Sequence, residues 1–152
     1  TMDIVDEIVI YSSDTNEMCE EILGRYEGYP VTIYPDPAST QRQTSAGGRT
    51  DLSILQDYGF RCRHRNRHPA IRDRVNSVNA MFQNAYGDSR LFVDADCKNL
   101  IRSLERQTYK EGTSLPDKTQ GYDHINDALG YMIEYLFPIS SNNIQHSRLS
   151  GL

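Results

Sequence analysis

Short β-branched runs alternate with helical patterns along this chain, and this alternation constrains the fold more than any other feature of the sequence. The predicted strands are residues 4–11, 31–34, 60–63 and 90–93, and the predicted helices are residues 15–26, 51–58, 69–85, 97–107 and 123–136. Strands joined by helices run parallel, because each helix returns the chain to the end of the sheet where it started. The sequence therefore predicts an α/β fold with helices covering a mainly parallel sheet, in which ligands gather at the carboxyl ends of the strands.

Several helix boundaries are signalled by residues that cap helices or break them. Thr15 and Thr50 are predicted to cap the helices near them, because a threonine hydroxyl can accept a hydrogen bond from a backbone N–H of the first turn. Gly28 and Gly59 are predicted to end these two helices. Residues 41–49 are predicted as a polar loop and residues 140–152 as a flexible tail, which leaves residues 1–139 as one domain of ordinary size.

Carboxylates in two parts of the chain suit a metal site. Asp123 and Asp127 are four residues apart and share one face of the last predicted helix, with His124 beside them. Asp36 lies between two prolines directly after the predicted strand at 31–34, and therefore at its carboxyl end. Carboxylates brought together from a helix and a strand end can hold Mg²⁺ or Mn²⁺ for phosphodiester cleavage.

Each of these residues also has a structural interpretation. Asp36 suits a turn, Asp123 suits a helix N-cap, and Asp127 suits an ion pair with an arginine or lysine across the site. His124 is predicted as a hydrogen-bonding neighbour of the site rather than a ligand. Lys118 either neutralises charge on the scissile phosphate or is a solvated loop lysine.

The charge is divided unevenly along the chain. The net charge is −5, yet residues 61–74 contain six arginines and one aspartate, a local charge of +5, so the remainder carries −10. Arginines on one side of an extended segment favour contacts with DNA phosphates without base specificity, although such an edge can also serve only to prevent aggregation. The predicted phosphate-contacting residues are Arg42, Arg49, Arg61, Arg63, Arg65 and Arg67.

Composition argues against several classes of protein. No apolar run approaches the ~20 residues that span a membrane, and we expect no secretion signal. The three cysteines are odd in number and widely spaced. This usage argues against a disulfide framework or a cysteine-based zinc site, and it fits a reducing cytoplasm.

A set of short motifs resembles, in order, those of phage terminase large subunits. They are Tyr34-Pro-Asp-Pro-Ala-Ser39, Arg74-Val-Asn-Ser-Val-Asn79, Asp96-Cys-Lys-Asn-Leu-Ile101, Asp117-Lys118 and Asp123-His-Ile-Asn-Asp-Ala-Leu-Gly-Tyr131. The match covers most of residues 3–139 and resembles the C-terminal nuclease half of that DNA-packaging protein. The resemblance implies an RNase H-like fold, with a mixed sheet flanked by helices.

The same resemblance implies a metal-dependent endonuclease that cuts concatemeric double-stranded viral DNA with little sequence specificity. Asp36 and Asp123 would be catalytic, Asp127 would join them as a ligand, and two Mg²⁺ or Mn²⁺ ions would be the cofactors. The implied partners are DNA and, in the parent protein, an ATPase domain, a small terminase subunit and a portal. The domain would be a monomer in isolation, without a membrane partner, in the cytoplasm of an infected bacterial host.

The beginning of the sequence departs from the family pattern. Residues 4–11 lead directly into a helix, so they resemble the third strand of the family's opening meander, whereas the first strand carries a catalytic aspartate. We therefore expect the N-terminal strands to be missing or truncated, and the sheet to have an unpaired edge beside the Asp36 strand. No P-loop motif of an ATPase half occurs. Two alternatives stay open: a non-catalytic DNA-binding or assembly fragment, and another RNase H-like nuclease such as a junction resolvase.

Overall fold

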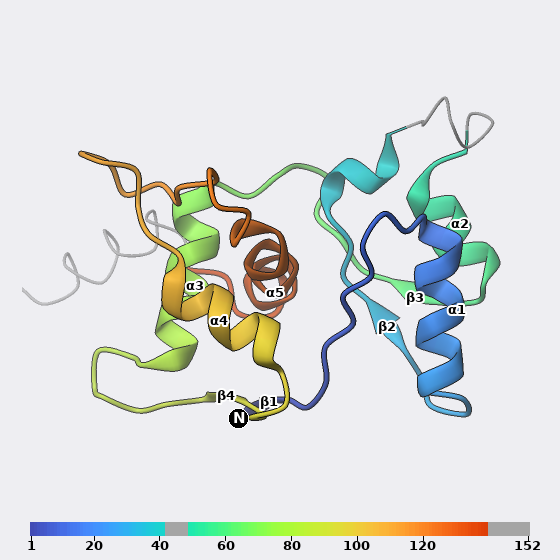
Figure 1. Ribbon diagram of the computed structural model, residues 1–152, viewed down its shortest axis with the longest axis horizontal. Coiled ribbons are helices and arrows are strands. Elements are labelled where there is room, and N and C mark those ends of the chain that lie inside the picture. Colours follow the sequence, from blue (N-terminus) through green and yellow to red (C-terminus); the bar gives the residue numbers. More distant parts are fainter. Residues whose placement is uncertain (42–48, 140–152) are drawn as a thin grey trace, which may run out of the picture. The chain divides into compact units, whose positions relative to one another are not determined.

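The helices and strands form two compact units in the computed structural model, which describes residues 1–41 and 49–139 (Figure 1). One unit contains residues 1–7 and the described residues from 69 onward. The other contains residues 8–68. The predicted domain of residues 1–139 spans both units, and its extent stays a prediction. Most of the predicted loop at 41–49 and all of the predicted tail at 140–152 lie outside the described residues.

Each unit contains both helices and parallel strands, which confirms the α/β prediction. The unit that we call the α3–α5 unit contains β1 (Met2–Ile4), α3 (Ile71–Phe82), β4 (Leu91–Val93), α4 (Lys98–Arg106) and α5 (Asp123–Leu136). The unit that we call the α1–α2 unit contains α1 (Thr15–Arg25), β2 (Thr32–Ile33), the 3-10 helix η1 (Pro37–Thr40), α2 (Asp51–Asp57) and β3 (Arg61–Cys62). None of the described helices is long and apolar enough to cross a membrane.

Strand pairing is parallel in both units. β1 pairs with β4, with Met2 opposite Leu91, and β2 pairs with β3, with Thr32 opposite Arg61. The described strands form two separate two-stranded sheets. Among the described residues β2, the strand before Asp36, pairs only with β3, so its other edge is unpaired, as expected.

The first predicted strand, at residues 4–11, is largely wrong. The strand covers only Met2–Ile4, and the chain leaves the sheet directly afterwards. Val5 and Tyr11 are 70% and 85% exposed, so the apolar side chains of this segment do not share a buried sheet face. A loose alternation of apolar residues was therefore insufficient to specify a strand.

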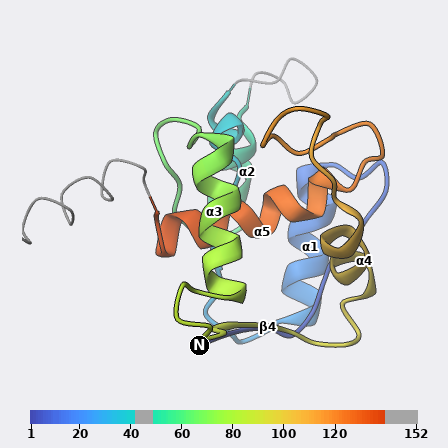
Figure 2. The same ribbon diagram turned by 90° about the vertical axis from the view of Figure 1, so that its left-hand side faces the viewer.

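A buried apolar cluster holds the α3–α5 unit together. It joins Val78 and Met81 of α3 to Leu129 and Ile133 of α5, and Leu91 of β4 packs with them. Figure 2 shows α5 crossing α3, with α4 beside α5. The bounds of α5 agree with the sequence prediction, because its apolar residues keep helical spacing to the end.

Helix α3 is shorter than the predicted range of 69–85. It begins after the N-cap residue Ala70, and its C-cap residue Gln83 is extended. The chain then turns through Asn84, whose side-chain oxygen accepts hydrogen bonds from the N–H groups of Tyr86 and Asp88. An asparagine that bonds its own following backbone favours a turn over another helical turn.

A second apolar cluster forms the core of the α1–α2 unit. Cys19 of α1 packs there with Ile54 and Leu55 of α2 and with Phe60. Thr50 caps α2 as predicted, by accepting from the N–H of Ser53 at 3.0 Å.

The N-cap of α1 is Asp14 rather than the predicted Thr15. Asp14 forms a capping box with Glu17, and the carboxylate is the stronger acceptor of the two candidates. Thr15 instead donates its hydroxyl to Asp51 Oδ1 at 2.6 Å, which ties the beginning of α1 to the beginning of α2.

Glu7 caps the N-terminus of α4, although it lies far from that helix in the sequence. Its carboxylate accepts hydrogen bonds from the backbone N–H groups of Asn99 and Leu100 at 2.9 and 2.8 Å, and from the Asn99 amide at 2.8 Å. The N-cap residue of α4, Cys97, makes no side-chain cap, so Glu7 satisfies N–H groups that have no partner within the helix. Burial alone would raise the pKa of the Glu7 carboxyl, but these hydrogen bonds outweigh it and hold the pKa below its usual value.

Glu7→Gln is expected to lower the free energy of unfolding by about 1–2 kcal/mol at neutral pH, because it removes the charge from a helix cap. Since the folded-state pKa is lowered, the charged form stabilises the fold above the unfolded-state value of about 4.3, and this contribution is lost as the pH falls through the folded pKa. Urea denaturation of both proteins should show a difference that shrinks below about pH 4. Asp3→Asn makes the same charge change at an exposed position of β1. An equal loss of stability there would contradict the capping role of Glu7.

Candidate functional site

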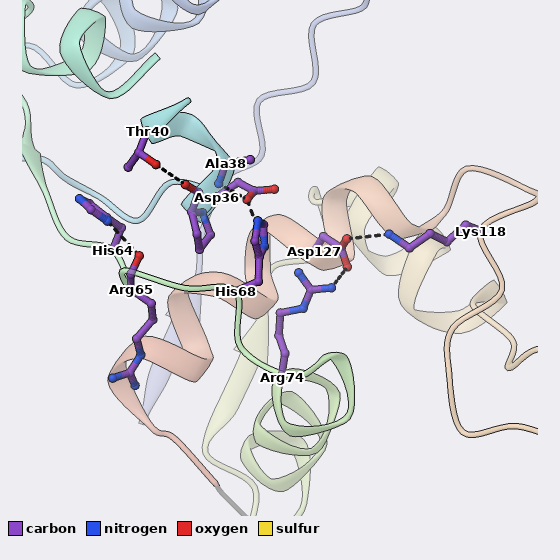
Figure 3. Close-up of polar contacts among 10 residues, drawn as sticks. Asp36, Ala38, Thr40, His64, Arg65, His68, Arg74, Lys118 and Asp127 are labelled. Carbon is purple, nitrogen blue, oxygen red and sulfur yellow. Dashed lines mark hydrogen bonds and ion pairs between the residues drawn. The ribbon is translucent and has the colours of Figure 1, made fainter. Parts of the chain in front are cut away.

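Asp36 is the N-cap residue of η1, three residues after the end of β2, and its carboxylate shapes that turn. Asp36 Oδ1 accepts a hydrogen bond from the N–H of Ala38 at 2.7 Å, and His68 Nδ1 lies 3.6 Å from the same oxygen (Figure 3). The structural interpretation of Asp36 as a turn residue is thereby confirmed. Its side chain remains 48% exposed, so the carboxylate is still accessible to a ligand. The metal-binding role of Asp36 stays a prediction.

Asp123 is the first residue of α5 and is nearly enclosed by protein. The N-cap is Tyr122, without a side-chain cap, so the prediction of Asp123 as the N-cap is wrong. Asp123 is only 5% exposed. Lys118 Nζ lies 3.2 Å from its Oδ2, whereas its buried Oδ1 has no hydrogen-bond partner among the described residues. A buried carboxylate with one unpaired oxygen is costly, so this position favours a further cationic or donor group.

Asp127 receives a cation on each of its oxygens. Arg74 Nη2 donates to Oδ1 at 2.6 Å, and Lys118 Nζ donates to Oδ2 at 3.3 Å. Figure 3 shows these two side chains reaching Asp127 from α3 and from the loop before α5. The predicted ion pair of Asp127 is confirmed, with both an arginine and a lysine. The interpretation of Lys118 as a merely solvated lysine is wrong.

Arg74 is held on three sides within the α3–α5 unit. It is 5% exposed, and its guanidinium carbon lies 4.4 Å from the centre of the Tyr131 ring, within the range of a cation–π contact. Gly130 leaves room for its aliphatic part, since a Cβ added at Gly130 would lie 2.8 Å from Arg74 Cγ. The arginine is therefore a fixed part of the α3–α5 contact, which sets the orientation of Asp127.

The loop between α4 and α5 positions Lys118. Gln107 donates its amide to the carbonyl of Asp117 at 2.6 Å, and the N–H of Asp117 donates to the carbonyl of Thr108 at 2.8 Å. The hydrogen bond to Asp123 raises the pKa of Lys118, and the charge of Asp127 adds to this effect although burial opposes it. The amine therefore stays protonated, and it binds both carboxylates as an ammonium.

The carboxylates of Asp123 and Asp127 offer the chemistry that Mg²⁺ or Mn²⁺ requires. Both Oδ2 atoms face one cationic atom, the Lys118 nitrogen, and carboxylate oxygens are preferred ligands of these hard ions. The charges of Asp123, Asp127, Arg74 and Lys118 cancel. In the part of the chain that the structure describes, no group of three or more His, Cys, Asp or Glu side chains forms a metal cluster. Mg²⁺ is commonly bound by only one or two carboxylates, with water and substrate phosphates as its other ligands, so two carboxylates would fit such an ion.

Asp36 belongs to the α1–α2 unit and the aspartates of α5 to the α3–α5 unit, and the structure describes each unit by itself. A site shared between them stays a prediction. His124 follows Asp123 on α5 and is exposed, and its role beside the site also stays a prediction.

A cavity of about 150 Å³ lies beside Asp127, between α3, α4 and α5. Arg74, Asn79, Gln107 and Asn126 contribute polar groups to its lining. Pockets for drug-sized ligands typically measure about 300–1,000 Å³. This cavity therefore does not indicate a separate small-molecule site.

The predicted DNA-contacting arginines differ in their surroundings. Arg61, Arg63 and Arg67 are exposed, and Arg65 is half-buried. Arg49 forms an ion pair with Asp57, and Arg42 lies outside the described residues. Only Arg61 and Cys62 of this run belong to a strand, so the predicted alternation over 61–67 does not continue beyond β3. These exposed arginines leave phosphate contact open as a prediction.

Arg74 was counted with the basic segment from the sequence, but it is buried and paired, so it does not add to a DNA-facing surface. A signal was available in its spacing. Arg74 precedes Val78 by four residues and Met81 by seven, which places it on the apolar face of α3. A buried charged residue on such a face requires a partner of opposite charge, and that partner is Asp127.

Comparison with models of known protein families gives a match. A family model described as a terminase RNaseH-like domain matches residues 12–136, which include α1 through α5. No curated protein and no solved structure matches the chain.

Proposed function

We propose that this chain, which belongs to the terminase RNaseH-like domain family, is a divalent-metal-dependent endonuclease that cuts concatemeric double-stranded viral DNA with little sequence specificity. Family membership makes it a terminase nuclease-type domain. Metal dependence, the DNA substrate and the packaging role are the proposed parts. In the parent protein the partners would be an ATPase domain, a small terminase subunit and a portal.

The carboxylates at the beginning of α5 carry this proposal. Asp123 and Asp127 both face one cation, and Asp123 keeps a buried oxygen that has no hydrogen-bond partner in the described part of the chain. Together with Asp36 they would hold Mg²⁺ or Mn²⁺, as two ions in the family pattern. A bound ion of this kind activates water and stabilises charge on the phosphate during hydrolysis.

The remaining residues would orient these ligands and the DNA. Arg74 fixes the rotamer of Asp127 through a 2.6 Å hydrogen bond from inside the unit. Lys118 can neutralise phosphate charge, because its ammonium lies at the same carboxylates and its side chain is 49% exposed. Arg61, Arg63 and Arg67 would contact the DNA backbone, which supports binding without base readout.

Cleavage of supercoiled plasmid tests the proposal. The chain is expected to nick the plasmid with Mn²⁺ or Mg²⁺ and to be inactive with EDTA, because hydrolysis would depend on the bound ion. Conversion to the open circular form is measured on a gel over time. Nicking that persists unchanged in EDTA would contradict a metal-dependent mechanism.

A non-catalytic DNA-binding or assembly domain is the second candidate. It is favoured by the neutralisation of Asp123 and Asp127 by Lys118 and Arg74, and by the finding of no cluster of three potential ligands in the described segments. This candidate predicts no nicking with any metal, but a gel shift of DNA that weakens as salt is raised. The plasmid experiment therefore separates the two candidates.

A further inference from the structure

We propose that Lys118 competes with the divalent ion for Asp123 and Asp127, so that an ion binds between these carboxylates only when the lysine ammonium leaves. This inference rests on the proposed function, because it concerns the same carboxylates. It assigns to Lys118 control over metal occupancy, in addition to the proposed contact with phosphate.

The contacts make the two cations mutually exclusive. Lys118 Nζ lies 3.2 Å from Asp123 Oδ2 and 3.3 Å from Asp127 Oδ2. Oxygen ligands surround Mg²⁺ at about 2.0–2.1 Å, so an ion bound to both of these oxygens would occupy nearly the same place as the ammonium. The other oxygen of Asp127 accepts from Arg74, and the other oxygen of Asp123 is buried. The ion therefore has no equivalent pair of accessible oxygens on these two residues.

Only one of the two cations at the site is free to leave. Arg74 has a side chain that is 6% exposed and that contacts Tyr131, so its departure would disrupt the contact between α3 and α5. The side chain of Lys118 is 49% exposed, and water can solvate its ammonium outside the site. The structure thus combines a fixed arginine, which orients Asp127, with a removable lysine.

Charge gives a reason for the exchange to depend on DNA. With Lys118 in place, the charges of Asp123, Asp127, Arg74 and Lys118 sum to zero. A divalent ion in place of the ammonium leaves a charge of +1 at the site, which attracts a phosphate. A phosphate nearby would also attract the released lysine. Occupancy by metal and binding of DNA should therefore favour each other.

Titration of the whole chain with Mn²⁺ by calorimetry tests this competition without any cleavage assay. Lys118→Met keeps much of the length of the side chain but removes its charge. Mn²⁺ would then no longer have to displace an ammonium that is paired with two carboxylates. Because such partly exposed ion pairs are weak, we expect Mn²⁺ to bind about tenfold more tightly. Lys118→Arg keeps the competing cation and should retain weak binding. Lys110→Met is the matched control, because it removes the same charge from the same loop, where Lys110 acts on Asp117 instead.

The outcomes separate this inference from the proposed function. Tighter binding in Lys118→Met alone supports the competition. Equal affinity in the wild type and Lys118→Met, or weaker binding in that variant, overturns the competition and leaves a metal-dependent nuclease intact. Equal tightening in Lys110→Met shows a general charge effect and also overturns it. No Mn²⁺ binding by any of the proteins contradicts the proposed function itself.

Discussion

Arg74→Met should lower the free energy of unfolding by about 3 kcal/mol, the cost typical of removing one partner from a buried ion pair. Methionine has a similar length and can fill much of the space beside Gly130. It cannot donate to Asp127 Oδ1 or make the cation–π contact with Tyr131. Asp127 would keep Lys118 as a partner, which limits the loss. Urea denaturation followed by circular dichroism measures the change.

Arg72→Met provides a matched control on the same helix. Arg72 is exposed, so its replacement should change the free energy of unfolding by no more than about 0.5 kcal/mol. The double variant Arg74→Met with Asp127→Asn completes a mutant cycle. It should be less destabilised than the sum of the two single variants, because each single variant already breaks the same hydrogen bond between Arg74 and Asp127. Strict additivity would show that the interaction between Arg74 and Asp127 contributes nothing to the free energy of unfolding.

The helices of this chain could be predicted from the sequence where local signals agree. The apolar spacing from Ile125 to Leu136 and the capping hydroxyl of Thr50 act within a few residues of the chain, and both predictions are confirmed. The parallel direction of the strands follows from the same alternation and is also confirmed. Strand length was not predictable in this way, because it depends on a partner strand that the local sequence does not specify.

The contacts of the site depended on residues far apart in the sequence. Asp123 and Asp127 could be placed on one helix face from their spacing, but Lys118 could not be assigned to them without the fold of its loop. Arg74 lies 53 residues from Asp127, and its burial was obscured by the exposed arginines that precede it. Glu7 caps a helix that begins more than 90 residues later, as Leu100 lies 93 residues from it. Such pairs are set by tertiary packing rather than by local pattern.

The placement of Arg74 and Lys118 changes how the local charge is interpreted. From the sequence, Arg74 belonged to a basic segment available to DNA, and Lys118 to an ordinary loop. In the structure both cations bind the carboxylates of α5. Their two positive charges offset the two negative charges of Asp123 and Asp127 at the beginning of this helix. A metal-dependent nuclease built on these carboxylates would have to exchange one of those cations for a metal ion, and Lys118 is the more exposed of the two.

Asp123→Asn is expected to reduce metal-dependent plasmid nicking about 100-fold or more. A metal ion contributes several kcal/mol to stabilising the transition state, and about 1.4 kcal/mol corresponds to a tenfold change in rate. Asparagine keeps the shape of the side chain and removes its charge, so the fold should survive while the ligand weakens. Initial rates of nicking in Mn²⁺ measure the loss, with thermal denaturation as a check on folding.

Asp3→Asn serves as the control for charge, since Asp3 is exposed on β1 and lies outside the proposed site. Asp36→Asn makes the same change in the other unit and asks whether that carboxylate takes part. Loss of nicking in both Asp36→Asn and Asp123→Asn would show that cleavage needs both carboxylates. Loss in Asp123→Asn alone would confine the ligands to the α3–α5 unit. Asparagine has nearly the same shape as aspartate but carries no charge. Full activity of Asp123→Asn would therefore show that the charge of Asp123 is not needed for cleavage.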